Sequence, residues 1–139
     1  MNRMIDIIPG KSLAGINLND NINNVIENIS SIYTIEINDG IIILDNGLIT
    51  IGYENSGSIY SIMCNEKFEG KYNDKLWPGM SVKDVLEHSR NQVALGGCVV
   101  VDGINGIGLP LPEGYDDFEN ITDFLSLDFI FKYLSVFRI

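Results

Sequence analysis

Residues 33–64 read YTIEINDGIIILDNGLITIGYENSGSIYSIMC, and this stretch determines the fold class. Segments rich in Ile and Tyr alternate with short Asn/Asp/Ser-Gly turns. The segments are 33–37, 41–44, 48–53 and 58–64, and the turns are 38–40, 45–47 and 55–57. Such turns supply positive φ angles and match the twist of antiparallel strands, so the stretch predicts a four-stranded meander. The segment 41–44 is apolar throughout, so we expect a central strand covered on both faces.

A short helix is predicted immediately before this meander. Ile22, Val25, Ile26 and Ile29 follow the i, i+3, i+4, i+7 spacing of one apolar helical stripe. The expected N-cap is Asn19 or Asp20, because a short oxygen-bearing side chain accepts hydrogen bonds from the first free amides of a helix.

A second helix and further strands are predicted after an exposed connection at 65–79. Ser81 and Asp84 form a capping-box pattern, and Gly96-Gly97 is expected to end the helix. Its predicted apolar face comprises Val82, Val85, Leu86 and Val93. A strand is expected at 98–101, and the alternation over 129–139 predicts a closing strand.

The two halves of the sequence resemble each other. GINLND at 15–20 corresponds to GMSVKD at 79–84, and each is followed by a helix and then by a strand that leads to Asp-Gly-Ile, at 39–41 and at 102–104. We therefore predict an α+β fold with two helix-plus-antiparallel-meander repeats around one core. Residues 1–139 would form a single domain, with an internal duplication at about 7–64 and 71–139.

The charge balance restricts the class of partner. The 139 residues include 19 acidic and 9 basic side chains, for a formal net charge of −10. This excess argues against nucleic acid and against anionic membrane surfaces, both of which would repel the chain, and favours a basic partner. No apolar run approaches the ~20 residues of a membrane-spanning helix.

The acidic residues are concentrated between Arg90 and Lys132, where no basic residue occurs. These carboxylates either face water, or are covered by distant cations, or meet a positively charged partner. Aromatic residues among them suit a protein interface, although Phe118 and Phe124 could equally belong to the core. The candidate binding residues are Asp102, Glu113, Tyr115, Asp116, Asp117, Phe118, Glu119 and Asp123, with Tyr72 and Trp77 as a second candidate patch.

No catalytic or metal site is recognisable in the sequence. His88 is the only histidine. Asp84 lies one helical turn away from it, and such Asp–His pairs are common on solvated helix faces, so we do not expect a general base here. One His and two separated cysteines, Cys64 and Cys98, do not make a zinc set, and we expect both thiols to be free. Gly-Ile-Asn-Gly-Ile-Gly at 103–108 lacks the phosphate-binding patterns and is read as a tight turn. No cofactor is expected.

Three stretches carry a resemblance to a known class. IIPGKSLAGINLND at 7–20, GKYNDKLWPGMSVKDVL at 70–86 and DDFENITDFLSLDFIF at 116–131 resemble small bacterial immunity proteins of contact-dependent growth inhibition and related polymorphic toxin systems. The resemblance implies a cytoplasmic, non-enzymatic protein that neutralises the toxic C-terminal domain of a cognate effector. Many such toxins are nucleases with basic clefts. The alternatives are a small enzyme or ligand-binding domain with a pocket between the repeats, and a structural subunit that pairs through a sheet edge.

Overall fold

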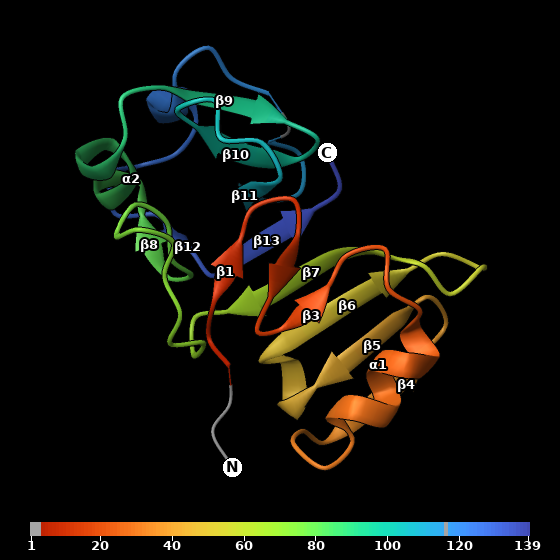
Figure 1. Cartoon of the computed structure of the whole chain (residues 1–139). Helices are drawn as coiled ribbons and strands as arrows, with labels where there is room; N and C mark the ends of the chain where they lie inside the picture. The colour runs from red at the N-terminus through yellow and green to blue at the C-terminus, as the bar shows by residue number, and fades with distance from the viewer. Residues whose placement is uncertain (1–3, 116) are drawn as a thin grey trace.

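The computed structural model describes residues 4–115 and 117–139 and has an α+β fold, as predicted (Figure 1). Within these residues two helices pack beside a largely antiparallel set of sheets. The helices are α1 (Ile22–Ile29) and α2 (Val82–His88), with 3-10 turns at η1 (Asp45–Gly47) and η2 (Ile121–Asp123). The central sheet contains β4 (Ile35–Asn38), β5 (Ile41–Leu44), β6 (Ile49–Tyr53), β7 (Ile59–Asn65), β9 (Gln92–Leu95), β10 (Cys98–Val101), β11 (Ile107–Pro110) and β13 (Tyr133–Phe137).

The order of the central sheet is β4-β5-β6-β7-β13-β11-β10-β9, with antiparallel pairing throughout. Each half of the chain contributes a helix followed by four of these strands, and the last strands of the two halves pair with each other. From either edge of the sheet to its middle, the strands therefore follow one another in chain order, β4 to β7 in one half and β9 to β13 in the other. The duplication of the sequence itself stays a prediction.

Two small sheets complete the fold. One contains β1 (Ile7–Ile8), β2 (Ser12–Leu13) and β3 (Ile16–Asn17), and the other pairs β8 (Met80–Ser81) with β12 (Ile130–Phe131). Figure 1 shows the first of these in front of the middle of the central sheet, between α1 and β13. No helix in the described part of the chain is long and apolar enough to cross a membrane.

The predicted meander agrees with β4–β7 to within one or two residues, but two details of the first half differ. The N-cap of α1 is Asn21, whose Oδ1 accepts from the Asn23 N–H at 2.9 Å. The expected caps Asn19 and Asp20 both precede this position, and the Asp20 carboxylate accepts instead from the Asn21 N–H at 3.0 Å. Strand β5 is covered on one face only, since Ile42 is buried while Ile41 is exposed, as is usual where an antiparallel sheet packs a single face on the core.

The second half departs further from the prediction. The capping box of α2 is present as predicted, but the helix ends at His88, and Val93 lies in β9 instead of on the helix. Gly96 and Gly97, with φ of +61° and +80°, form the two-residue turn of the β9–β10 hairpin, for which positive φ at both positions is required. The glycine- and proline-rich segment after β10 contains β11, which was not predicted, and the expected closing strand is divided into β12 and β13.

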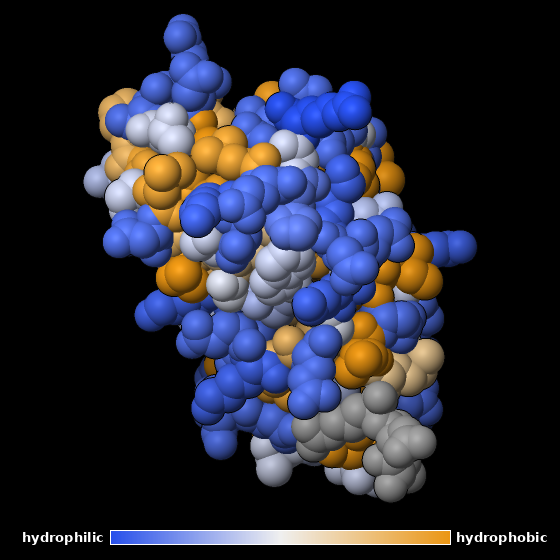
Figure 2. Space-filling view, turned by 90° about the vertical axis from the view of Figure 1, so that its left-hand side faces the viewer, coloured by the Kyte–Doolittle hydropathy of each residue, from blue (hydrophilic) through white to orange (hydrophobic). Residues whose placement is uncertain are grey.

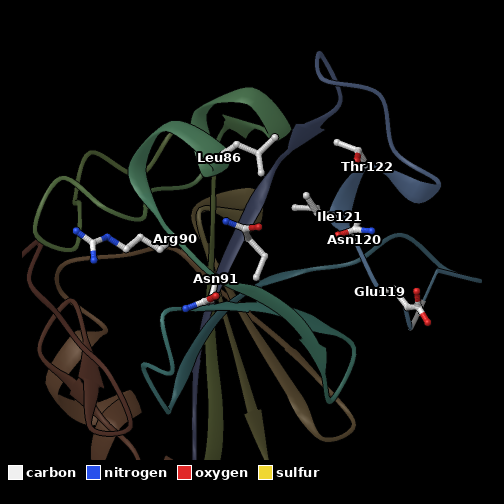
Figure 3. A pocket seen from close by; sticks show the side chains of 8 residues that line it. Leu86, Arg90, Asn91, Glu119, Asn120, Ile121 and Thr122 are labelled. Carbon is white, nitrogen blue, oxygen red and sulfur yellow. The ribbon is translucent and has the colours of Figure 1, made fainter.

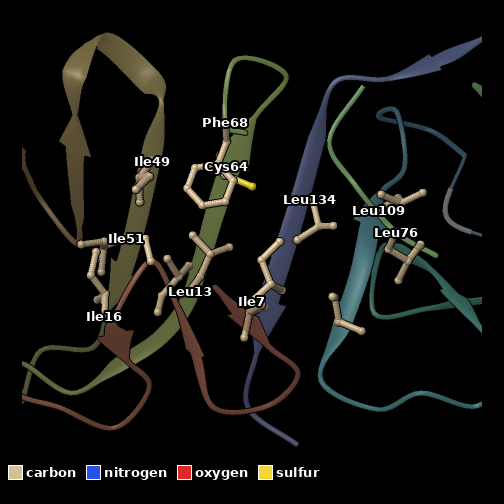
Figure 4. Close-up of a cluster of buried hydrophobic side chains, with 14 of the residues drawn as sticks. Ile7, Leu13, Ile16, Ile49, Ile51, Cys64, Phe68, Leu76, Leu109 and Leu134 are labelled. Carbon is tan, nitrogen blue, oxygen red and sulfur yellow. The ribbon is translucent and has the colours of Figure 1, made fainter. Parts of the chain in front are cut away.

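One part of the core lies where the first small sheet packs against the central sheet, and the same buried cluster extends to both helices. Figure 4 shows Ile7, Leu13 and Ile16 of the small sheet beside Ile49, Ile51, Cys64 and Leu134 of the central strands. Each fully buried aliphatic side chain of this kind contributes about 1.5–3 kcal/mol. The cysteines are free and buried, and desolvation raises the pKa of the Cys64 thiol to about 12 and that of Cys98 to about 11.

A backbone contact between glycines joins the first small sheet to the second half of the chain. The Gly10 N–H donates to the Gly106 carbonyl at 3.0 Å, and the Phe137 N–H donates to the same oxygen. A Cβ atom added at Gly106 would lie 2.3 Å from the Gly10 nitrogen and 2.5 Å from its Cα. The approach therefore requires a residue without a side chain, which explains one glycine of the 103–108 segment.

This contact yields a stability prediction. Gly106→Ala should lower the free energy of unfolding by about 3 kcal/mol, because it combines left-handed strain with a clash against backbone atoms that cannot rotate away. Gly103→Ala is the matched control: its φ is +67° and its added Cβ meets nothing within 4 Å, so we expect a loss of about 1 kcal/mol. Urea unfolding measures both, and equal losses would show that the clash is relieved.

Candidate protein-binding surface

The residues between β11 and β12 form an exposed acidic segment, here called the acidic arch (residues 111–129, of which 116 lies outside the described residues). Figure 1 shows the arch passing over the end of the sheet that carries β9 and β10. Buried Ile121 and Leu125 attach it to the core. Local hydrogen bonds shape it: the Asn120 N–H donates to the Asp123 carboxylate at 2.9 Å, and the Phe118 N–H donates to Asp117 at 2.9 Å.

The carboxylates of the arch are exposed and lack ion pairs with the described cations. They are Glu113, Asp117, Glu119, Asp123 and Asp128. The ion pairs that the described residues form are Lys75–Asp102, Lys83–Glu87 and Arg138–Glu54, and none of them reaches the arch. The predicted acidic surface is thus brought together on one segment at one end of the sheet, except for Asp102, which lies elsewhere, and Asp116, which is not described.

Two aromatic residues of the arch are presented to solvent. The rings of Tyr115 and Phe124 lie 6.1 Å apart between centroids, and their exposed fractions are 42% and 64%. Phe118, in contrast, is half-buried and packs against the core. Of the two interpretations, the core role therefore applies to Phe118, whereas Phe124 is available as an anchor for a partner.

A hollow of about 300 Å³ lies between α2, the start of β9 and η2. Its lining residues are Leu86, Arg90, Asn91, Gln92, Glu119, Asn120, Ile121 and Thr122. Figure 3 shows Leu86 and Ile121 projecting into the space between α2 and η2, while Arg90 points away from it. The hollow belongs to the second half of the chain alone, so it is not the pocket between repeats that the enzyme alternative requires.

Asp102 has a structural role and does not belong to the candidate surface. Its Oδ1 accepts from the backbone N–H groups of Arg90 and Asn91 at 2.8 and 2.9 Å, and its Oδ2 is paired with Lys75. The hydrogen bond from Lys75, followed by those from the backbone, lowers the pKa of Asp102 from 3.8 to about 2. The carboxylate thereby fixes the connection between α2 and β9, which explains why the helix ends earlier than predicted.

The second candidate patch, Tyr72 and Trp77, is half-buried and separate from the arch in the sequence. The Trp77 ring contacts His88 edge-on at 5.0 Å between centroids, and the Lys71 ammonium lies 5.0 Å from the Trp77 centroid. The Tyr72 N–H donates to the Leu76 carbonyl at 2.8 Å. Trp77 therefore packs the 65–79 connection against α2, in keeping with its position beside Pro78.

The described part of the chain offers no metal centre. Among residues 4–115 and 117–139, no group of three or more His, Cys, Asp or Glu side chains could hold a metal ion.

Figure 2, which views the molecule from the left of Figure 1, shows a mainly hydrophilic surface with apolar groups interspersed. Comparison of the chain with protein-family models, with curated proteins and with solved structures gives no match. The functional argument therefore rests on the residues of this chain.

The Asp102 contacts predict a pH-dependent stability. Asp102→Asn should lower the free energy of unfolding at pH 7 by about 1–3 kcal/mol, because the charge-assisted hydrogen bonds are lost while Asn tolerates the left-handed backbone at this position. Since the folded pKa is lowered, the contribution is full above pH 3.8 and is lost as the pH falls through about 2.

Urea unfolding of wild type and variant at about pH 7, 5, 3 and 2 measures this difference. Glu87→Gln serves as the control, because it removes only an exposed i,i+4 pair with Lys83 and should change the stability by less than about 0.5 kcal/mol. A difference between Asp102→Asn and wild type that stayed constant down to pH 2 would contradict the role of the charge.

Proposed function

We propose that this chain is an immunity protein that binds and neutralises the toxic C-terminal domain of a cognate bacterial toxin. The observation that supports the proposal is the acidic arch: five exposed carboxylates without a described cationic partner, beside an exposed aromatic pair. Such a surface suits a basic protein, with aromatic anchors inside a charged rim. The resemblance of the sequence to immunity proteins supports the same function.

A toxin with a basic, phosphate-binding cleft fits this surface best. A nuclease neutralises phosphate charges with Lys and Arg, and the carboxylates of the arch would occupy the same cations. Complementary charge also accelerates encounter, toward ~10⁸–10⁹ M⁻¹s⁻¹ at low salt, which suits an inhibitor that must act before the toxin does. Inhibition by occlusion requires no chemistry of the inhibitor, so the proposal assigns no catalytic residue and no cofactor.

The proposal places the protein in the cytoplasm of the toxin-producing cell, where the toxin would otherwise act on that cell. The rival reading as an enzyme or ligand-binding domain draws support from the hollow beside α2, which is one of several hollows of about 240–300 Å³ in the described residues. Its volume is at the lower end of the range of small-molecule sites, about 300–1,000 Å³, and its lining is largely polar where such sites are mostly apolar. The arch is therefore the better candidate for the functional surface.

Removing charge from the arch tests the proposal. The combined variant Glu113→Gln, Asp117→Asn, Glu119→Gln should weaken binding of the cognate toxin domain by about tenfold, mainly through slower association. Stopped-flow association and growth rescue on co-expression measure the two effects. Raising the salt from about 50 to about 300 mM should slow the wild type more than the variant.

The matched control is Glu27→Gln, Glu36→Gln, Asp39→Asn. It removes the same three charges at exposed positions of the first half. We expect it to change association by less than about twofold, because these acids lie outside the arch. Equal effects of both variants would point to net charge alone, and an unaltered affinity of the arch variant would contradict the proposed surface.

A further inference from the structure

Strand β9 ends the central sheet and leaves one side of its backbone free. It pairs with β10 through Leu95↔Cys98, Ala94↔Val99, Val93↔Val100 and Gln92↔Val101. In the same register, the Asp102 N–H donates to the Asn91 carbonyl at 2.9 Å. Since bonded and non-bonded pairs alternate in an antiparallel ladder, Val93 and Leu95 bond to β10, whereas Gln92 and Ala94 direct their N–H and C=O groups outward. Those outward groups have no hydrogen-bond partner in residues 4–115 and 117–139.

The free side of β9 also lacks the protection that edge strands usually carry. Residues 91–101 contain no charged residue and no proline, which are common devices against unwanted pairing. Val93 and Leu95 are 51% and 57% exposed and lie on the same face of the strand. The opposite edge of the sheet, β4, carries Glu36 and continues into Asp39. Of the two edges, β9 is the one that is open to another strand.

The surroundings of β9 determine the charge of its occupant. The hollow beside α2 is lined by Arg90, Asn91 and Gln92 on one side and by Glu119 of the acidic arch on the other, and the Arg90 side chain points away from it (Figure 3). An incoming backbone that follows β9 therefore passes near Glu119, whose carboxylate forms no ion pair with the described cations. A second copy of this chain would bring a second acidic arch into the same place, so repulsion disfavours it. A segment that carries Lys or Arg gains from the same field.

We propose that β9 accepts an extended, basic segment of the partner protein as an additional strand of the sheet. The segment would exchange backbone hydrogen bonds with Gln92 and Ala94. Apolar side chains at alternate positions would cover Val93 and Leu95, and Lys or Arg side chains between them would meet the field of the arch. The identity of the partner rests on the proposed function, whereas the strand addition itself can be tested without the toxin.

The test uses the peptide acetyl-Lys-Val-Lys-Val-Lys-Val-amide and the full chain. Ala94→Pro removes an outward N–H while leaving the β10 ladder intact, which edge strands tolerate. It should weaken peptide binding by about tenfold or more, as the lost backbone pairing requires. Ile37→Pro is the matched control at the other edge: the Asp45 N–H donates to Thr34, so the same alternation directs the Ile37 N–H outward. It should leave binding unchanged.

Amide exchange provides a readout that does not depend on how a proline is tolerated. The peptide should slow exchange at Gln92 and Ala94 of the wild-type chain, and a peptide with N-methyl groups on alternate residues should not. The corresponding Glu-Val peptide should not bind either. Absence of Lys-Val peptide binding at about 1 mM, a loss on Ile37→Pro equal to that on Ala94→Pro, or unprotected amides would each overturn the inference.

Three further outcomes separate this inference from the proposed function. Concentration-dependent dimers of the free chain that protect the same amides would mean that a second copy occupies β9, which overturns the inference. Growth rescue by Ala94→Pro at the wild-type level, with peptide binding lost, would also overturn it, while toxin neutralisation through the arch would stand. If peptide binding depends on β9 but the toxin domain does not bind the chain, the strand addition is supported and the immunity function is refuted.

Discussion

The pairing of β7 with β13 is the interaction on which the rest of the structure depends. It joins the ends of the two meanders over five residue pairs, from Tyr133↔Asn65 to Phe137↔Ser61, and its inward-facing residues are buried. A pairing between segments so distant in sequence forms only when the loop entropy is offset by burial, here of Ile62, Cys64, Leu134 and Val136. Because the last strands of both halves are used in this seam, the first strands, β4 and β9, become the edges of the sheet.

The parts of the fold that the sequence predicted are those decided by a few neighbouring residues. The Asx-Gly turns of the first meander and the Ser81–Asp84 capping box act locally, so their patterns suffice. The end of α2 was mispredicted because it is decided by Asp102, which binds the backbone of residues 90 and 91 from across the β9–β10 hairpin. Gly96-Gly97 fits a helix end and a two-residue hairpin equally well in sequence, so these two residues do not decide between them.

The candidate surface likewise has parts that the sequence predicted and parts that it could not predict. A run of acids without Lys or Arg between positions 90 and 132 is visible in the sequence, and the structure leaves most of these carboxylates exposed. The sequence could not show that Asp102 differs from the other acids, because its partner Lys75 lies 27 residues away. It also could not show that Phe118 is half-buried and Phe124 exposed, because their burial depends on which residues attach the arch to the core. The free edge of β9 had a usable signal: Val-Ala-Leu-Gly-Gly-Cys at 93–98 fits a two-residue hairpin, and the stretch contains no charge.

The arch and the β9 edge supply interactions of different range. Because they lie next to each other, both can act on the same partner. Carboxylates act over roughly a Debye length, about 8–10 Å at physiological salt, and attract any basic protein without fixing its orientation. Backbone groups of an edge strand act only within hydrogen-bond distance, but they fix both direction and register. Long-range attraction at the arch followed by short-range pairing at Gln92 and Ala94 would thus convert a generally acidic protein into a selective one. Selectivity among basic proteins would then lie in whether a partner offers an extended segment with an unpaired backbone edge, a property that charge alone does not provide.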